Sequence, residues 1–338
     1  MPGAGGGDRL RIGVVGTGSL GFHHARILRD VDGVEMVGIH DVRPERASEV
    51  SRELGVAVHE TLESLLDDAD AIVVAVPTTY HEQVAVAALE RGIHTMIEKP
   101  MAPDLAAADR ILAAAAASGA VVQIGHVERF NQAIRAAEPY LDRPLFVESH
   151  RMAPFSPRST DVAVVLDLMI HDVDLVGSLV GRPLVDISAS GIPVLTPNID
   201  IANARLTYEG GAVANLTASR VSMERMRKIR LFQPSGYLSL DLAGGTGEFL
   251  RLKRDIAAFS GDAEVPPPPP EGLAALVERI PLQGDGAEPL RKELESFRDA
   301  VRGERPPVVS GRDGREALAL TLSIEERIRA HVPDPRPS

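Results

Sequence analysis

The stretch that decides the fold runs from Leu10 to Gly21 and reads Leu-Arg-Ile-Gly-Val-Val-Gly-Thr-Gly-Ser-Leu-Gly. Its first half, which ends at Val15, is a short apolar run that predicts a buried strand. Its second half begins at Gly16, fits the pattern G-x-G-x-x-G, and leads into a helical pattern that begins at Ser19. A glycine-rich turn between a strand and a helix is typical of a parallel α/β nucleotide-binding domain.

The three glycines of this turn have separate tasks in binding a dinucleotide. Gly16 permits the tight turn, Gly18 lets the backbone approach a pyrophosphate, and Gly21 lets the helix pack closely on the strand. Ser19 and Leu20 open the helix, where free N–H groups and a partial positive charge favour phosphates. We therefore predict a dinucleotide site at these residues. A turn without a ligand, or a site for FAD or an S-adenosyl compound, is the alternative.

An acidic residue, Asp41, lies at the end of the second predicted strand. A carboxylate at this position accepts hydrogen bonds from the adenosine ribose hydroxyls and repels a 2′-phosphate. Arg43 lies close by in the sequence and partly offsets that negative charge. The pattern therefore predicts NAD as the cofactor and makes NADP the weaker alternative.

The first part of the chain alternates strand-like and helix-like patterns, which predicts a parallel sheet with crossover helices. Asp104 stands where the last of these helices begins, and Gly119 stands where it ends. His23 and His24 are expected on the surface of the first helix or in its packing. The predicted strands are 10–15, 34–39, 56–58, 71–76, 95–97 and 121–124, and the predicted helices are 19–29, 44–54, 81–91 and 105–119.

After about residue 126 the pattern changes to consecutive strands and one long apolar helix, 165–180. Consecutive strands joined by glycine turns favour an antiparallel sheet. We predict strands at 145–150, 185–190, 199–208, 212–221, 228–233, 237–242 and 248–252, and closing helices at 288–301 and 315–330. The expected architecture is α/β, with a flexible tail at 1–8, an N-terminal Rossmann domain at 9–126, and a C-terminal α+β domain at 127–332 that has a large, mostly antiparallel open sheet.

The composition excludes several classes of function. The formal net charge of −12 disfavours nucleic-acid binding, because that needs a basic surface. The chain contains no cysteine, which excludes disulfides, thiolate metal sites and cysteine nucleophiles, and its histidines lack the spacing of metal ligands. The N-terminus lacks the features of a signal peptide, and the stretch 105–117 is too short and too charged to span a bilayer. We expect a cytoplasmic protein without a metal or a membrane partner.

A lysine, Lys99, follows the fifth predicted strand in the triplet Glu98-Lys99-Pro100. Because the carboxyl ends of strands in an open α/β sheet face the ligand crevice, we expect this ammonium beside the nicotinamide end of a dinucleotide. Glu98 is in position to orient the ammonium, and Pro100 holds the preceding residue in an extended conformation. A solvated lysine without a function is the alternative.

A carboxylate and an imidazole, Asp167 and His171, occur four residues apart on the long apolar helix. Residues with this spacing share one helix face. Oxidation of a secondary alcohol needs a base that titrates near the working pH, which histidine provides and which lysine provides when a cation lies nearby. We expect Lys99 and His171 to act on one hydroxyl, while Asp167 anchors the substrate or orients His171. A purely structural Asp–His pair is the alternative.

These motifs together resemble the Gfo/Idh/MocA oxidoreductase family. The stretch from Val76 to His81 is similar to the family's cofactor-contacting loop, which implies contacts from Pro77, Thr78 and His81, although asparagine is common where this chain has Thr78. The stretches 289–297 and 307–311 are also similar to the family, so the resemblance covers nearly the whole chain.

This resemblance implies an NAD(P)-dependent oxidoreductase that acts on CH–OH groups of sugars. Lys99 and His171 are then the proton-transfer residues, and Glu98 and Lys99 also contact the cofactor. The resemblance further implies a homodimer or homotetramer formed through the C-terminal sheet.

Two further stretches, 125–131 and 165–172, are similar to family members that oxidise the 3-hydroxyl of UDP-N-acetylglucosamine, although those members have proline where this chain has Gln132. Such a substrate carries a diphosphate, which arginine binds through paired hydrogen bonds. The implied substrate site consists of Lys99, Arg129, Asn131, Arg151, Arg158, Asp167 and His171. Solvated surface charge is the alternative for each arginine.

Two other functions are compatible with the sequence. A dehydrogenase of free sugars such as inositol or glucose would use the same catalytic residues without cations for a diphosphate. A non-catalytic NAD-binding sensor would need neither Lys99 nor His171, and the presence of both argues against it.

Overall fold

The computed structural model describes residues 9–156, 162–253 and 277–331, and the chain divides into two compact units. The first unit comprises residues 1–130 and 288–319, and the second comprises residues 131–287 and 320–338. The first junction lies close to the boundary at residue 126 that the sequence predicts. The segment 288–319 differs from the prediction, because it packs with the first unit instead of the second. The predicted tail at 1–8 lies outside the described residues.

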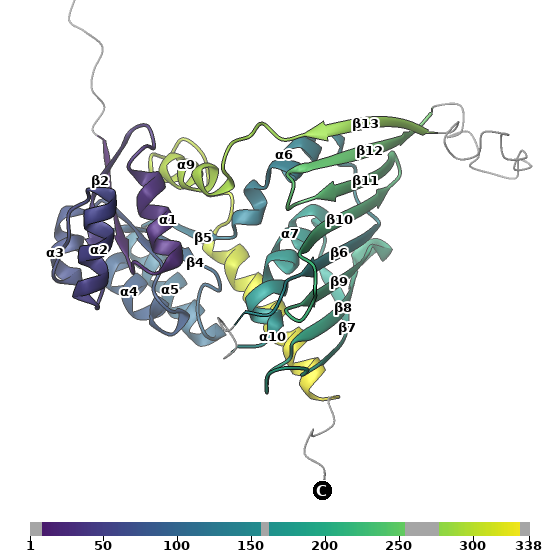
Figure 1. Cartoon of the computed structure of the whole chain (residues 1–338), viewed down its shortest axis with the longest axis horizontal. Coiled ribbons are helices and arrows are strands. Elements are labelled where there is room, and N and C mark those ends of the chain that lie inside the picture. The colour runs from purple at the N-terminus through teal and green to yellow at the C-terminus, as the bar shows by residue number, and fades with distance from the viewer. Residues whose placement is uncertain (1–8, 157–161, 254–276, 332–338) are drawn as a thin grey trace, which may run out of the picture. The chain divides into compact units, whose positions relative to one another are not determined.

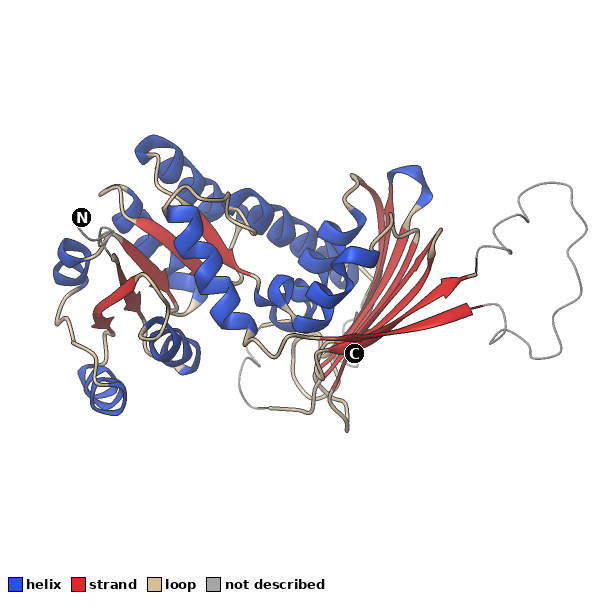
Figure 2. Ribbon diagram, turned by 90° about the horizontal axis from the view of Figure 1, so that it is seen from above, coloured by secondary structure: helices blue, strands red, loops and turns tan. Residues whose placement is uncertain are grey.

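The first unit is built on a five-stranded parallel sheet in the order β2-β1-β3-β4-β5, with helices on both faces (Figure 1 and Figure 2). Because both faces are covered, a central strand such as β3 buries all of its residues. The sequence prediction of a Rossmann-type parallel sheet is thereby confirmed. The strands are β1 Leu10–Val15, β2 Val34–His40, β3 Ala71–Val74, β4 His94–Glu98 and β5 Val122–Gly125.

The helices of this unit begin and end at residues that the sequence marks. Asp104 accepts a hydrogen bond from the Ala107 N–H at 2.8 Å, and the same helix ends at Gly119, which has a left-handed φ of 74°. The late helix α9 packs against α1, and its Leu294 and Phe297 join the core of the unit. The helices are α1 Ser19–Leu28, α2 Pro44–Leu54, α3 Leu62–Asp68, α4 His81–Leu89, α5 Leu105–Ser118 and α9 Pro289–Val301.

In this unit one predicted strand is wrong, and one helix is missing from the prediction. The run 56–58 forms a single bridge from Val58 to Ile39 in place of a sixth strand, since polar residues follow it at once and leave no apolar length to pair. The short helix α3 is absent from the prediction. Only Leu65 and Leu66 of its residues are buried, so the segment carries too little periodicity to be recognised.

The second unit contains an eight-stranded sheet in the order β13-β12-β11-β10-β6-β9-β8-β7 (Figure 1). Its neighbouring strands are antiparallel except for the parallel pair β6 and β9, so the predicted mostly antiparallel sheet is confirmed. The sequence does not predict β13, because Pro281 lies inside it; proline is tolerated there at the edge of the sheet. The strands are β6 Phe146–Met152, β7 Leu184–Ile192, β8 Ile201–Tyr208, β9 Val213–Ser219, β10 Met226–Gln233, β11 Gly236–Asp241, β12 Thr246–Leu252 and β13 Val277–Gln283.

One face of this sheet forms the core of the second unit. Along β8 the residues alternate, with Ala204 and Leu206 buried and Asn203 and Arg205 exposed. The buried face packs against α6 Gln132–Ala137, α7 Ile170–Val180 and the C-terminal part of α10 Gly311–Arg329 (Figure 2). Among the described helices, none combines the length and the apolar composition that crossing a bilayer requires.

Candidate active site

The glycine turn connects β1 to α1, as the sequence predicts. Gly16 has a φ of 88°, and a Cβ there would lie 2.7 Å from the carbonyl oxygen of Ala75. A Cβ on Gly21 would overlap the carbonyl oxygen of Gly16, whereas a Cβ on Gly18 would meet no atom within 4 Å. The fold itself therefore requires Gly16 and Gly21. Gly18 borders open space at a helix N-terminus, which fits the pyrophosphate of a dinucleotide.

Alanine at the last two glycines of the turn is expected to have different effects. Gly21→Ala should lower the melting temperature by about 10 °C or more, because the new methyl group collides with backbone. Gly18→Ala should fold with a melting temperature within about 2 °C of wild type but bind NAD about tenfold more weakly, because the methyl group takes the space of the pyrophosphate. Circular dichroism and calorimetric titration measure the two effects. Unchanged NAD affinity in Gly18→Ala would contradict the assignment of this turn.

Asp41 follows β2, and its carboxylate accepts hydrogen bonds from the glycine turn. Its Oδ2 accepts hydrogen bonds from the Thr17 N–H at 2.7 Å and from the Thr17 hydroxyl at 2.9 Å. Its Oδ1 accepts from the backbone N–H of Arg43 at 2.9 Å and from Arg43 Nε at 3.2 Å. Burial opposes ionisation, but the bonds from Arg43 and Thr17 outweigh it and lower the pKa of Asp41 to about 2. Asp41 is therefore ionised at neutral pH.

Four further predicted cofactor residues lie directly after β1 and β3, at the carboxyl edge of the sheet. Ser19 and Leu20 are the first residues of α1, and both are exposed. Pro77 is exposed and precedes a short 3₁₀ turn, Thr78–Tyr80, that leads into α4. Since the carboxyl edge of an open parallel sheet is where ligands bind, these positions are consistent with the predicted contacts.

His81 is buried at the start of α4, with both ring nitrogens next to backbone carbonyls. Nδ1 lies 3.0 Å from the oxygen of Pro100, and Nε2 lies 2.9 Å from the oxygen of Val76. Burial lowers the pKa of His81 and outweighs these carbonyls and the charge of Glu98, which favour protonation. A neutral imidazole donates only one hydrogen bond at a time. His81 thus joins the loop after β3 to the segment after β4, and its contact with a cofactor stays a prediction.

Glu98 is the last residue of β4, and Lys99 follows it at the carboxyl edge of the sheet, as predicted. The Glu98 carboxylate is buried, and its Oε1 lies 2.6 Å from Nε2 of His24 on α1. The sequence predicts His24 on the surface of the first helix or in its packing, and it carries no signal for this pair because the two residues are far apart along the chain.

Asp167 and His171 lie on a continuous helical segment of the second unit. Asp167 belongs to a π-helical turn, Val165–Met169, which leads directly into α7, where His171 lies. Both side chains are partly exposed, whereas Val165 and Met169 belong to the core. The carboxylate and the imidazole therefore project from the side of the helix that faces away from the core. A π turn inside an α-helix is frequent at functional sites.

Arg151, a predicted substrate residue, lies on β6 and forms a buried ion pair with Asp172 of α7. Arg151 Nε lies 2.8 Å from Oδ2, and Nη2 lies 3.0 Å from Oδ1, with side chains only 4% and 3% exposed. Because Asp172 is the neighbour of His171, this pair fixes the helix that carries the imidazole. A contact of Arg151 with substrate stays a prediction.

The other predicted substrate residues lie in different surroundings. Asn131 is buried at the start of α6, where Oδ1 accepts from the Ala133 N–H at 3.0 Å and Nδ2 donates to the Leu242 carbonyl at 2.9 Å. Arg129 is half-buried in a 3₁₀ turn of the first unit. Arg158 lies outside the described residues. The structure thus gives Asn131 a role in capping the helix and leaves its substrate contact a prediction.

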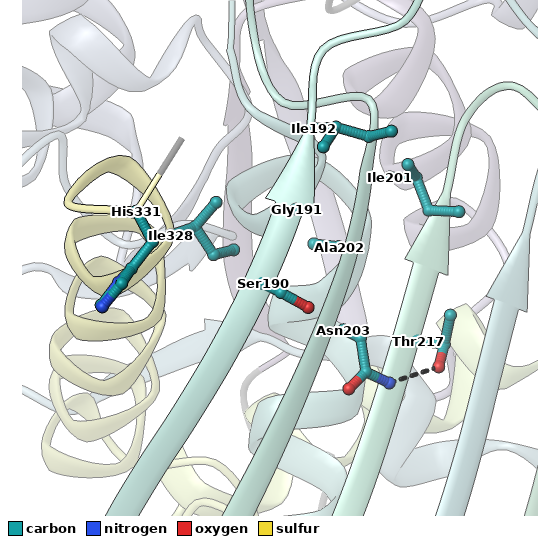
Figure 3. Close-up of a pocket in the computed structure, with 9 residues that line it drawn as sticks. All are labelled: Ser190, Gly191, Ile192, Ile201, Ala202, Asn203, Thr217, Ile328 and His331. Atoms are coloured by element: carbon teal, nitrogen blue, oxygen red, sulfur yellow. Dashed lines mark hydrogen bonds between the residues drawn. The ribbon is translucent and has the colours of Figure 1, made fainter. Parts of the chain in front are cut away.

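The second unit has a hollow of about 420 Å³ at β7, β8, β9 and the end of α10, and Figure 3 shows the residues that line it. Its walls are mostly apolar, with Ile201 and Ile328 among them, and Asn203 Nδ2 donates to Thr217 Oγ1 at 2.9 Å beside it. Of the described residues that line it, none belongs to the predicted site and only His331 carries a titratable side chain. This hollow therefore lacks the acid–base pair that alcohol oxidation uses.

Similarity to known proteins covers both units. Residues 10–126 match the oxidoreductase family with an NAD-binding Rossmann fold, and residues 123–239 match the GFO/IDH/MocA C-terminal domain. The chain is 35% identical to UDP-N-acetylglucosamine 3-dehydrogenase of Acidithiobacillus ferrooxidans, over 96% of this chain and 98% of that protein. A solved structure of the same enzyme superposes with a TM-score of 0.85 at 33% identity, over 95% of this chain and 98% of that chain.

The inositol dehydrogenases are also similar to this chain. Myo-inositol 2-dehydrogenase of Thermotoga maritima is 26% identical, over 94% of this chain and 96% of that protein. The glycine turn and Asp41 lie where the dinucleotide-binding fingerprint of a Rossmann domain has its glycines and its acidic residue. From the matched domains and the full-length similarity, the chain belongs to the Gfo/Idh/MocA oxidoreductase family, with an NAD-binding Rossmann domain.

Proposed function

We propose that the protein oxidises the 3-hydroxyl of UDP-N-acetylglucosamine with NAD⁺ and forms the 3-keto sugar nucleotide, NADH and a proton. The observation that carries this proposal is the similarity to an enzyme of that name over nearly the full length of both chains. Such a product supplies a ketone for a later amination.

The protein residues have separate roles in this reaction. When NAD⁺ is bound, its nicotinamide would supply the hydride acceptor for the carbon that bears the hydroxyl. Lys99 and His171 are the candidate acceptors of the hydroxyl proton. Asp167 shares its helix face with His171, so it orients the imidazole or anchors the sugar.

A purified-enzyme assay tests the substrate. The protein is incubated with NAD⁺ and either UDP-N-acetylglucosamine, free N-acetylglucosamine or myo-inositol, with hydroxylamine present to trap the ketone and pull the equilibrium forward. We expect NADH absorbance to rise with the nucleotide sugar at a kcat/KM at least about 100-fold above that of either free compound. In a parallel reaction without hydroxylamine, reduction of the ketone product with borodeuteride should place deuterium at C3. No NADH from the nucleotide sugar in the presence of the trap would exclude the proposal.

A free-cyclitol dehydrogenase is the second candidate, because inositol dehydrogenases match this chain at 26–27% identity. A diphosphate needs cations that a cyclitol does not. Arg129→Met and Arg158→Met should therefore raise the KM for the nucleotide sugar, whereas neither would change the KM for inositol if inositol were the substrate. Faster turnover of inositol than of the nucleotide sugar would select this second candidate.

We propose NAD over NADP on the basis of Asp41. Asp41→Ser should weaken NAD binding about tenfold and tighten NADP binding, because the ribose loses an acceptor and the 2′-phosphate no longer meets an anion. Asp70→Ser is the control, since Asp70 is a partly exposed carboxylate of the same unit that pairs with Arg11. Calorimetric titration of the wild type and the two variants with NAD and with NADP gives the six dissociation constants. Tighter binding of NADP than of NAD to the wild-type protein would overturn the preference.

We also propose a cytoplasmic homodimer or homotetramer formed through the eight-stranded sheet. The face of this sheet opposite the core carries partly exposed aromatic residues, with Phe232 stacked on Tyr237 at a centroid distance of 4.6 Å. Light scattering on the purified protein measures the assembly, and Phe232→Glu should dissociate it. A wild-type mass equal to one chain would rule out the assembly.

A further inference from the structure

The carboxylate of Glu98 is part of a buried couple with His24. Glu98 Oε1 lies 2.6 Å from His24 Nε2, the side chain of His24 is fully buried, and that of Glu98 is 10% exposed. Gly125 is paired with Glu98 in the sheet, and a Cβ at Gly125 would lie 3.2 Å from the carboxylate. The chain therefore leaves room at this point for a carboxylate in the interior, which is costly unless the group is paired.

The hydrogen bonding of His24 indicates the net charge of the couple. Within the described ranges, His24 Nδ1 is buried and has no hydrogen-bond partner. A second proton on the ring would leave a buried cationic N–H without an acceptor, which costs more than a bare ring nitrogen. The neutral imidazole with its proton on Nε2 fits this site, and it donates to an ionised Glu98. The couple then carries one negative charge.

Several groups act on the Glu98 carboxyl from the elements packed around it. Burial opposes its ionisation, but the hydrogen bond from His24 on α1 and the positive charge of Lys99 are among the contributions that outweigh burial and lower the pKa of Glu98. β5, the neighbouring strand, contributes Gly125 and no titratable side chain. The influence of charge is mutual, so an ionised Glu98 favours the ammonium form of Lys99 as much as Lys99 favours the carboxylate.

The same couple also holds the backbone of the segment that carries Lys99. Glu98 Oε2 accepts a hydrogen bond from the Lys99 N–H at 3.2 Å. On the other side of Lys99, the carbonyl oxygen of Pro100 lies 3.0 Å from Nδ1 of His81. The position of the Lys99 backbone is thus defined by two buried histidines that do not belong to the predicted catalytic set.

We propose that the buried His24–Glu98 couple keeps a negative charge fixed next to Lys99 and thereby sets the protonation state of its ammonium. His24 is a positioning residue that acts through Glu98. The consequence for catalysis rests on the proposed function, in which Lys99 exchanges the hydroxyl proton, whereas the titration of Lys99 does not depend on any substrate.

Three variants separate the parts of this proposal. Glu98→Gln removes the charge, so the apparent pKa of Lys99 should fall by about one unit. His24→Leu removes the hydrogen-bond donor to Glu98, so burial should raise the pKa of Glu98 and leave the carboxyl protonated. The apparent pKa of Lys99 should then fall by a similar amount. His24→Gln keeps an amide N–H near the position of Nε2, so Lys99 should titrate within about 0.3 units of wild type. His23→Leu, at the adjacent helix position, is the control.

The chain contains only four lysines, Lys99, Lys228, Lys253 and Lys292, so the ammonium can be followed directly. Protein labelled with [ε-¹³C]lysine is titrated by NMR from about pH 6 to about pH 11, which brackets the usual titration of lysine. The Lys99 signal is identified by its absence in Lys99→Arg. An unchanged Lys99 titration in Glu98→Gln would overturn the proposal, and so would a shift in His24→Gln equal to that in His24→Leu. If His24→Leu fails to fold, Glu98→Gln and His24→Gln decide the matter.

The pH dependence of turnover gives the second readout. With UDP-N-acetylglucosamine, the acidic limb of kcat/KM should move to lower pH by about one unit in Glu98→Gln and His24→Leu but not in His24→Gln. An unmoved limb in Glu98→Gln would refute the catalytic part of the proposal. If the wild-type enzyme oxidises none of the sugars, the proposed function fails while the NMR titration still tests the couple, so the two failures are distinguishable.

Discussion

Lys99→Ala is expected to lower kcat with UDP-N-acetylglucosamine by about 10³-fold while the dissociation constant of NAD changes less than about threefold. The removal of a positioned acid–base group costs 10²- to 10⁴-fold, and the glycine turn and Asp41, which form the proposed dinucleotide site, are left intact. Steady-state NADH formation gives kcat, and calorimetry gives the affinity for NAD.

Lys292→Met is the matched control for this variant. Lys292 lies on α9, pairs with Glu295 at 2.7 Å and is partly exposed, so its loss should change neither kcat nor NAD affinity by more than about twofold. The pH profiles of kcat/KM for Lys99→Ala and His171→Asn then identify the base. The acidic limb should disappear only in the variant that lacks the base. Turnover in Lys99→Ala within about tenfold of wild type would show that Lys99 is not a proton-transfer residue and would favour His171.

The elements that follow from local patterns could be predicted from the sequence. The turn at Gly16 and Gly18 has a spacing that only a few folds use, and its context of strand, helix and acidic residue is complete within 32 residues, from Leu10 to Asp41. Asp104 and Gly119 are effective signals for the same reason, since a helix cap is decided by neighbours three or four residues away.

The elements that depend on distant partners could not be predicted in this way. His24 and Glu98 are 74 residues apart, and their pairing depends on how α1 lies across the sheet. Arg151 is a basic residue in a charged stretch of sequence, which predicts a contact with a diphosphate, whereas the structure pairs it with Asp172. The helix α9 comes late in the chain but packs within the first unit. No local pattern in the sequence shows this contact.

Arg151→Met should lower the free energy of unfolding by about 3–5 kcal/mol, because it leaves the Asp172 carboxylate buried without its partner. The pair Arg11–Asp70 provides a matched control, since it has the same two-point geometry but side chains 46% and 38% exposed. Arg11→Met should therefore leave the free energy of unfolding nearly unchanged. The chain has no tryptophan, so urea unfolding is followed by far-UV circular dichroism.

The double variant Arg151→Met/Asp172→Leu separates two effects on the free energy of unfolding. One is the cost of leaving a single charge buried without its partner, and the other is the net contribution of the ion pair. Replacing a buried ion pair with apolar side chains is often nearly neutral, so the double variant should recover most of the stability that Arg151→Met loses. If Arg151 instead binds the diphosphate, Arg151→Met would raise the KM for the nucleotide sugar and leave the unfolding free energy unchanged. Because Asp172 adjoins His171 on α7, we expect the opposite pattern. The free energy of unfolding and kcat should both fall while KM stays within about threefold of wild type, since the Arg151–Asp172 pair holds the helix that carries His171 on β6.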